Sequence, residues 1–377
     1  MKYFEEKSAK NALEGKPPIV KRKCEIERIA EGCIDIRRTT GQHPGGIVVL
    51  PIGEEIHSFT PVQHPANDMT TSIVTTHFDY HSIDHNLLKL DILGHLDPTM
   101  IRMLQDLTGI DPLEIPLDSK EVMSLFQNTS ALGIKPEDIG GTKLGALGIP
   151  EFGTDFAMQM LMDTKPQYFS DLVRIAGLAH GTDVWLGNAQ TLIKEGKATI
   201  STAICTRDDI MIYLIQKGLD SEESFKIMEM VRKGKVASGK CKEWPEWKQD
   251  MIDHGVPDWY IWSCERIKYM FPKAHAAAYV MMAWRVAYCK VFYPLAYYTA
   301  YFSIRATAFD YEKMAMSPVR LEHYIAEYKA KKAEGTISNT EEDELGVMRI
   351  VQEMHARGYE FTPIDIYKAK GKNIPDN

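Results

Sequence analysis

The sequence predicts an α+β protein that is predominantly helical. Short β-branched or alternating runs gather in residues 36–97, and almost everything after them shows helical periodicity. The composition agrees, because 44% of the 377 residues are hydrophobic and 25% are charged, the ordinary balance of a chain with a large core. We therefore expect a small α/β part followed by a large helical part.

The α/β part is expected to begin with helices. A charged amphipathic helix, a Gly-Lys-Pro-Pro break and a second helix with Ile26, Ile29 and Ala30 at helical spacing fill residues 1–38. Strands are then expected at three runs bounded by Pro, Asn or Asp, which are residues 45–51, 73–80 and 87–93.

The helical part is expected to start at Pro98, with Asp97 as N-cap, and its first helix is expected to stop at Gly109. Two Gly- and Pro-rich stretches, 132–153 and 235–247, predict long loops, which in a folded protein are usually functional or disordered.

Charge and cysteine content limit the function classes. Six cysteines without a CxxC pair predict reduced thiols rather than a disulfide framework or a zinc site. The charged N-terminus is no signal peptide, and the most apolar stretch, 276–302, is interrupted by Arg285, Lys290 and Pro294. We expect a cytoplasmic protein with no membrane partner.

The net charge of −8 argues at first against a protein that binds nucleic acid. Positive charge is concentrated, however, because residues 226–290 hold twelve Lys and Arg against seven Asp and Glu, a local net of +5 that leaves −13 for the rest. Tyr, Phe and Trp are interleaved with these cations. This segment is the candidate surface for an anionic ligand.

The run LLKLDIL places Lys89 and Asp91 on one strand face and Leu88, Leu90 and Ile92 on the other. Burying a cation and a carboxylate is costly without partners, so the pair must meet solvent, each other or a ligand. A strand-surface ion pair is one interpretation. The other is that Asp91 binds a divalent metal and Lys89 meets phosphate.

Two neighbouring segments are weaker candidates. In HFDYHSIDH, His77 and Asp79 would share a strand face, and His81, Asp84 and His85 follow within a turn, a density typical of metal ligands. In RTTGQHPGG at 38–46, Arg38, two threonines and three glycines favour a phosphate-binding loop, although no Walker motif follows.

The segment FPKAHAAAY combines a helix start with cations. Pro272 suits the first turn of a helix, which places Lys273 and His275 at an end where the dipole disfavours positive charge. A bound anion would remove this conflict. Tyr279 lies four residues after His275 on the same face, so phosphates at the imidazole and a base at the ring form one interpretation. A core tyrosine beside a surface histidine is the other.

The sequence also resembles a known family, the PolC-type DNA polymerase III of low-GC Gram-positive bacteria. The resemblance is nearly collinear from about residue 20 to 310 and continues to 377. It rests on RTTGQHPGG, TTHFDYHSIDHNLLKLDILGH, DPTMIRMLQDLTGIDP, LGIPEFGT, GLAHGTDVWLGNAQ, RDDIMIYLI, KIMEMVRKGK and IKYMFPKAHAAAY. GQHPGG favours the PolC type over the sister form of the enzyme, which has an HAGG-type loop.

The resemblance implies a partial nucleotidyltransferase palm sheet of the polymerase-β kind and a large helical fingers domain. It assigns 1–35 to the end of the thumb, 36–97 to the distal palm, 98–310 to the fingers and 311–377 to the truncated start of the following duplex- and clamp-binding region. The implied activity is template-directed addition of dNTPs to a primer 3′-hydroxyl by a two-metal mechanism. Primer-template DNA and dNTPs are the implied ligands, and a sliding clamp and other replisome subunits would bind through regions outside this chain.

The resemblance also implies roles for six residues. Asp91 resembles the third of three catalytic aspartates that hold two Mg²⁺ ions, and Lys89 resembles a lysine that contacts the incoming triphosphate. Arg232, Lys233 and His275 match fingers residues that face the triphosphate. Tyr279 matches the residue that packs against the incoming base.

The family's other two aspartates form an Asp-x-Asp motif that this sequence lacks, so the Mg²⁺ site is expected to be incomplete and the chain alone inactive. Two alternatives stay open. One is a DNA-binding segment without catalysis, and the other is a metallohydrolase built on His77, Asp79, His81 and His85.

Overall fold

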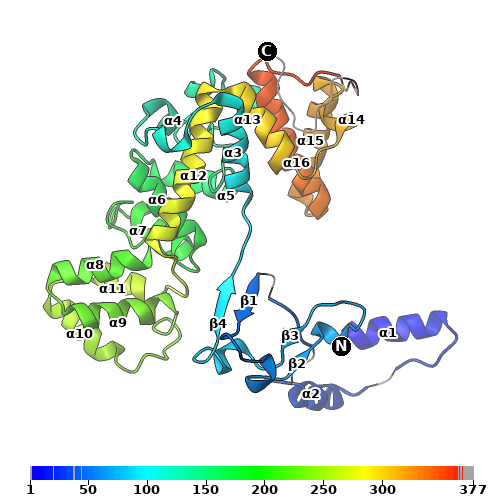
Figure 1. Cartoon of the computed structure of the whole chain (residues 1–377), viewed down its shortest axis with the longest axis vertical. Coiled ribbons are helices and arrows are strands. Elements are labelled where there is room, and N and C mark those ends of the chain that lie inside the picture. Colours follow the sequence, from blue (N-terminus) through cyan, green and yellow to red (C-terminus); the bar gives the residue numbers. More distant parts are fainter. Residues whose placement is uncertain are drawn as a thin grey trace. The chain divides into compact units, whose positions relative to one another are not determined.

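The computed structural model divides the chain between Gly94 and His95 into an N-terminal and a C-terminal unit. It describes residues 2–19, 21–36, 39–43, 45–363, 365 and 367. Figure 1 shows that the named strands all precede Gly94, whereas helices make up most of the C-terminal unit. The predicted mainly helical α+β class is therefore confirmed.

The N-terminal unit contains two helices and four short strands. They are α1 (Lys2–Leu13), α2 (Lys23–Gly32), β1 (Gly46–Val49), β2 (Val62–Gln63), β3 (Thr75–Thr76) and β4 (Leu88–Asp91). Strand β1 pairs with β4 and β2 with β3, both antiparallel, so the described strands form two separate two-stranded sheets.

The strand expected at 73–80 is mostly wrong, because only Thr75–Thr76 pairs as β3. After it the chain bends, since the Asp79 carboxylate accepts a hydrogen bond from the backbone N–H of His81 at 3.0 Å and begins a 3-10 turn. Local side-chain bonding of this kind competes with a strand ladder. His77 and Asp79 therefore do not share a strand face.

The β1–β4 ribbon leaves an apolar face exposed. Ile47 is paired with Leu90 and Val49 with Leu88, and all four side chains face solvent together with Ile92. The sequence predicts that Leu88, Leu90 and Ile92 lie on the face opposite Lys89 and Asp91, and in the structure this face is exposed. The reason is that the described part of the unit contains almost no core, with only Thr60, Ile83 and Leu87 buried.

The C-terminal unit consists of helices joined by turns. They are α3 (Leu96–Thr108), α4 (Lys120–Ser124), α5 (Asp155–Thr164), α6 (Phe169–His180), α7 (Gln190–Lys194), α8 (Arg207–Lys217), α9 (Ser221–Arg232), α10 (Trp244–Asp253), α11 (Asp258–Cys264), α12 (Lys273–Phe292), α13 (Pro294–Ala300), α14 (Tyr311–Met314), α15 (Pro318–Glu334) and α16 (Asn339–Ala356). The 20-residue α12 packs against α3, α6 and α13 (Figure 1). None of the helices in the described ranges is both long and apolar enough to cross a membrane.

Helix α3 ends where the sequence predicts but begins earlier. Gly109 terminates it in the left-handed conformation with φ 73°, which glycine adopts without strain. Its N-cap is His95 rather than Asp97. Asp97 instead forms an ion pair with Arg305, a long-range partner that its local sequence does not reveal.

The stretch 132–153, predicted as a long loop, is part of the core. Leu144, Leu147 and Phe152 are buried within it. Two backbone carbonyls of the same stretch accept hydrogen bonds from the Lys290 ammonium group, Gly145 at 2.8 Å and Leu147 at 2.5 Å. The segment is thus fixed against α12.

Lys290 is fully buried together with Glu353, which lies on α16. Their charged atoms are 2.9 Å apart, and the Tyr298 hydroxyl donates a further hydrogen bond to Glu353 at 2.8 Å. Every charged group of this cluster therefore has partners, the condition under which a buried ion pair is tolerated.

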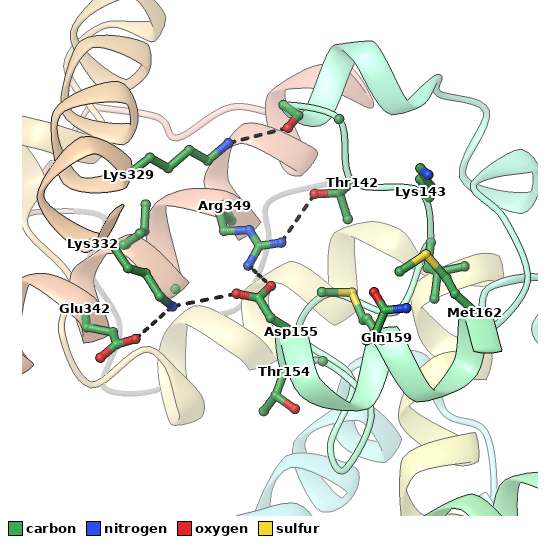
Figure 2. A pocket seen from close by; sticks show the side chains of 17 residues that line it. Thr142, Lys143, Thr154, Asp155, Gln159, Met162, Lys329, Lys332, Glu342 and Arg349 are labelled. Atoms are coloured by element: carbon green, nitrogen blue, oxygen red, sulfur yellow. Dashed lines mark hydrogen bonds and ion pairs between the residues drawn. The ribbon is translucent and has the colours of Figure 1, made fainter. Parts of the chain in front are cut away.

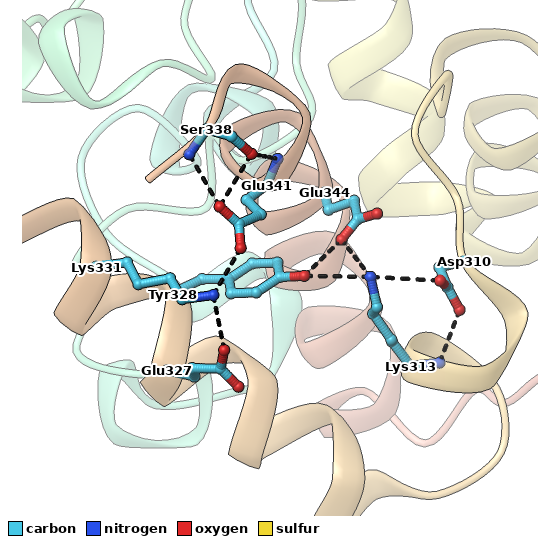
Figure 3. A network of polar contacts seen from close by, with 8 residues as sticks. All are labelled: Asp310, Lys313, Glu327, Tyr328, Lys331, Ser338, Glu341 and Glu344. Carbon is cyan, nitrogen blue, oxygen red and sulfur yellow. Dashed lines mark hydrogen bonds and ion pairs between the residues drawn. The ribbon is translucent and has the colours of Figure 1, made fainter. Parts of the chain in front are cut away.

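A second polar network joins α14, α15 and α16 (Figure 3). Lys313 contacts Glu344 at 2.7 Å and the Tyr328 hydroxyl at 3.1 Å. Lys331 lies between Glu327 at 2.8 Å and Glu341 at 2.6 Å. These contacts hold the charge-rich C-terminal helices together in addition to their buried apolar side chains.

The buried pair yields a prediction for stability. Lys290→Met should lower the free energy of unfolding by about 3–5 kcal/mol, because it leaves the Glu353 carboxylate buried without its cation. Lys290→Met combined with Glu353→Leu should recover much of this loss. Denaturant unfolding followed by circular dichroism measures both.

The matched control is Lys226→Met, which removes an exposed ion pair with Glu222 and should cost less than about 1 kcal/mol. If Lys290→Met and the control had equal effects, the pair would not organise the core.

Candidate functional site

Lys89 and Asp91 lie on the same face of β4, as predicted. The Lys89 ammonium is 3.2 Å from the Asp91 carboxylate and 5.2 Å from the centre of the Tyr80 ring. Across the ribbon, Asp91 is opposite Gly46, which has no side chain. The carboxylate is therefore open to a ligand, while its present partner is the ion-pair lysine.

Gly45 and Gly46 of GQHPGG have a structural role, because side chains at these positions would collide with the chain. A Cβ atom at Gly45 would lie 2.5 Å from the Ile92 carbonyl, and one at Gly46 would lie 2.9 Å from the His43 ring. Glycine is thus needed for the close approach of β1 to β4. Arg38, the cation expected in this loop, lies outside the described residues.

The histidines of HFDYHSIDH do not converge. His77 bonds to Gln63 at 2.7 Å, and His81 and His85 lie 3.9 and 3.7 Å from Asp84. Over the described ranges, no group of three or more His, Cys, Asp or Glu side chains could hold a metal ion. The residues here, Asp91 included, do not by themselves fit a two-metal centre.

Arg232 and Lys233 share one carboxylate. Arg232 ends α9 and bonds bidentately to Glu229, and the Lys233 ammonium is 2.8 Å from the same carboxylate. The hydrogen bond from Arg232 lowers the pKa of Glu229 to about 2. Two cations on one anion leave the turn with a net positive charge.

The turn after α9 packs against the segment that leads into α12. The Arg232 carbonyl accepts a hydrogen bond from the backbone N–H of Met270 at 3.3 Å. Gly234 has φ 68°, and a Cβ atom there would lie 2.5 Å from the Lys268 carbonyl. The structure thus brings two separate sequence motifs, VRKGK and IKYMFPKAHAAAY, together.

At the start of α12 the helix dipole disfavours the cations Lys273 and His275, and carboxylates of the protein itself offset this effect. Pro272 is the N-cap, and the backbone N–H of Lys273 donates to the Asp208 carboxylate at 2.7 Å. The Lys273 ammonium is 3.4 Å from Asp209. Carboxylates at the start of α8 therefore already supply negative charge at this helix end, and the bound anion stays a prediction.

His275 and Tyr279 do form one surface, with ring centroids 4.7 Å apart. Tyr279 also exchanges a 2.9 Å hydrogen bond with His95, and His275 meets Phe271 edge to face at 5.0 Å. Partial burial, with a smaller contribution from the Glu151 and Asp97 carboxylates, raises the pKa of Tyr279. Phe271 lies only four residues before His275, so this contact is local, whereas no local pattern reveals His95, which is 184 residues from Tyr279.

Four of the six predicted residues, Arg232, Lys233, His275 and Tyr279, therefore lie in the C-terminal unit near the start of α12. Asp91 and Lys89 belong to the N-terminal unit.

A cavity of about 640 Å³ lies elsewhere in the C-terminal unit (Figure 2). None of the six predicted residues lines it. Two of its cations are used internally, because Arg349 contacts Asp155 at 2.6 Å and Lys332 contacts Glu342 at 2.8 Å. The first pair joins α16 to α5 and the second joins α15 to α16.

Comparison with known families defines the class of protein. Residues 97–255 match the bacterial DNA polymerase III alpha subunit finger domain, and residues 1–94 match the bacterial DNA polymerase III alpha NTPase domain. The boundary between the two matches coincides with the division of the structure near Gly94.

Curated relatives narrow the class. The chain is 52% identical over 373 residues to the DNA polymerase III PolC-type of Caldanaerobacter subterraneus subsp. tengcongensis, covering 99% of this chain and 25% of the relative. It is 56% identical over 348 residues to that of Streptococcus suis, covering 92% and 24%, and 53% identical over 352 residues to that of Staphylococcus saprophyticus, covering 93% and 24%. The chain belongs to the PolC-type DNA polymerase III family. It spans about a quarter of the length of these relatives.

The Glu229 cluster yields a prediction with a pH dependence. Glu229→Gln should destabilise the protein by about 1–3 kcal/mol above pH 5, because the native carboxylate has its pKa lowered from 4.5 to about 2 by Arg232. Because the pKa of Glu229 is lower in the native state, the carboxylate stabilises the fold above pH 4.5, and this stabilisation is lost as the pH falls towards 2. The difference between wild type and variant should therefore shrink in acid.

Urea unfolding at a series of pH values between 2 and 7 measures this difference, and carboxylates common to both proteins cancel. A difference independent of pH would contradict the ion-pair assignment.

Proposed function

We propose that this chain supplies the nucleotide-facing part of a replicative DNA polymerase that adds dNTPs to a primer 3′-hydroxyl. The observation that carries the proposal is the meeting of VRKGK and IKYMFPKAHAAAY beside the start of α12, in a chain 52–56% identical to PolC-type polymerases. Cations and a pair of adjoining aromatic rings near one helix start suit a nucleoside triphosphate.

Each proposed contact follows from the chemistry of its side chain. Arg232 and Lys233 share a single carboxylate, so positive charge remains for the triphosphate. His275 is exposed, and its ring N–H would donate a hydrogen bond to a phosphate oxygen. Tyr279, one turn further along α12, offers a ring held by His95 against which a base stacks.

Lys89 and Asp91 are proposed to serve the same reaction from the N-terminal unit, Lys89 at the triphosphate and Asp91 as one ligand of Mg²⁺. The open position opposite Gly46 supports access to Asp91. Mg²⁺ prefers several oxygen ligands, and the described residues offer one carboxylate here. The remaining ligands are therefore assigned to other parts of the polymerase or to the substrate.

The domain assignment is part of the proposal. Residues 1–35 would form the end of the thumb, 36–97 the distal palm, 98–310 the fingers and 311–377 the start of the next region. The exposed apolar face of the β1–β4 ribbon and the near absence of a core before Gly94 support an incomplete palm sheet. Primer-template DNA, dNTPs and, through other regions, a sliding clamp are the proposed partners.

A second candidate function concerns the chain by itself, which is DNA binding without catalysis. The net charge of +5 over residues 226–290, together with a single carboxylate on β4, favours it. Affinity for primer-template DNA should then fall with salt concentration while no nucleotide is incorporated in the presence of Mg²⁺. Robust extension by the 377-residue chain would contradict this assignment.

For the full polymerase, Asp91→Asn should reduce nucleotide incorporation by at least about a hundredfold, because a metal-ligand charge is lost. Affinity for primer-template DNA should change little. Primer extension and DNA-binding assays measure the two effects separately.

The matched control is Asp84→Asn, an exposed carboxylate of the same unit whose neighbours are His81 and His85. It should retain full activity. Turnover of Asp91→Asn at the rate of the control would disprove the role of Asp91.

The incomplete palm yields a separate prediction. Ile47→Thr combined with Leu90→Thr should leave the unfolding free energy of the 377-residue chain within about 1 kcal/mol, because both side chains are already in water. Binding of a hydrophobic fluorescent dye should fall. In the full polymerase the same pair should be clearly destabilising.

Ile83→Thr, at a buried position of the same unit, is the control that should destabilise both proteins. Equal behaviour of Ile47→Thr/Leu90→Thr in the short chain and the full polymerase would show that nothing covers this face.

A further inference from the structure

An unbroken series of aromatic rings extends beyond the predicted site. His180 stacks on Phe271 with centroids 4.7 Å apart and planes 29° apart, and Phe271 contacts His275 at 5.0 Å. His275 then contacts Tyr279 at 4.7 Å, and Tyr279 contacts His95 at 5.2 Å. The orientation of His275 is therefore set from the Phe271 side, and that of Phe271 from His180.

Glu151 fixes the far end of the series. Its carboxylate forms a hydrogen-bonded ion pair with His180 Nε2. This hydrogen bond raises the pKa of His180, which favours the imidazolium over the face of Phe271.

The backbone of Glu151 is itself constrained. It has φ 68°, a left-handed conformation that costs a non-glycine residue about 1 kcal/mol or more. Its neighbours impose this conformation, because Phe152 is buried and a Cβ atom at Gly153 would lie 3.0 Å from backbone atoms of Gly148 and Ile149. The carboxylate is thus held in place by the fold rather than by chance surface contact.

Backbone pairing fixes the other partners. Thr182 forms a bridge with Tyr269, with its N–H donating to the Tyr269 carbonyl at 2.9 Å. A Cβ atom at Gly181 would lie 3.0 Å from the same carbonyl. The end of α6, which carries His180, is therefore locked against the segment that carries Phe271 into α12.

We propose that Glu151 and His180 form a positioning pair for the incoming nucleotide. His180 orients His275 through Phe271, and its charge cancels that of Glu151 beside the phosphates. The inference rests on the proposed function, since it assumes that the nucleotide meets His275. Neither residue touches the reacting atoms. The charged groups packed near this surface include Asp97, paired with Arg305, and Lys273, which meets Asp208 and Asp209. The imidazole of His95 contacts Tyr279.

The first test is kinetic and uses the full polymerase with dGTP as the varied nucleotide. His180→Gln leaves Glu151 as an unpaired anion and should raise KM about tenfold, with kcat within about twofold of wild type. Glu151→Gln keeps a hydrogen-bonding side chain without charge, and KM should stay within about threefold. The double variant should recover only part of the loss in His180→Gln, because the unpaired anion is gone but Phe271 still lacks the His180 ring.

The matched control is His254→Gln, which removes a histidine–carboxylate pair of similar exposure on α10, 3.3 Å from Asp250. It should leave KM unchanged. A wild-type KM for His180→Gln, or a double variant as impaired as His180→Gln, would overturn the proposal.

The second test keeps the inference independent of the function. Imidazole NMR of the 377-residue chain should show the ring signals of His275 displaced in His180→Gln and in Phe271→Leu, but not in His254→Gln, with the backbone spectrum reporting an intact fold. Unmoved His275 signals would overturn the positioning role even if the polymerase is active. A wild-type polymerase that incorporates no nucleotide would overturn the proposed function, while displaced signals would still support the positioning of His275.

Discussion

The C-terminal unit depends on the buried contact between Lys290 and Glu353. An ammonium group with no access to water must have all its hydrogens accepted, and here a carboxylate and two backbone carbonyls do so. Because the three acceptors come from α16 and from the stretch 145–147, one side chain of α12 fixes the positions of two distant segments. The stretch that sequence composition marks as a loop is ordered for this reason.

The other end of α12 is organised by charge as well. A helix N-terminus preceded by proline and followed by Lys273 and His275 would repel its own cations, and Asp208 and Asp209 from α8 cancel that repulsion. The backbone N–H of Lys273 is consequently occupied by the Asp208 carboxylate. The candidate groups at this end of α12 are therefore side chains, the cations of Arg232 and Lys233 and the rings of His275 and Tyr279.

Local spacing predicts much of this arrangement. Gly109 ends α3, Pro272 begins α12, and the i, i+4 spacing of His275 and Tyr279 places their rings in contact, all from rules that act within one turn. The failures share a physical cause, which is distance along the chain. Asp208 lies 65 residues from Lys273, His95 lies 184 from Tyr279 and Lys290 lies 63 from Glu353, so no local pattern reveals these pairs. The exposed face of the β1–β4 ribbon shows another limit of local patterns, because alternation predicts an apolar face without indicating whether another element covers it.

Helix α12 carries the buried Lys290 near one end and His275 at the other, over 20 residues that span about 30 Å. A straight helix of this length transmits a small rotation at one end as a displacement at the other. A displacement of α16 is therefore carried through Lys290 to the end of α12 that holds His275 and Tyr279. The packing of the C-terminal helices is coupled in this way to the position of the two aromatic rings.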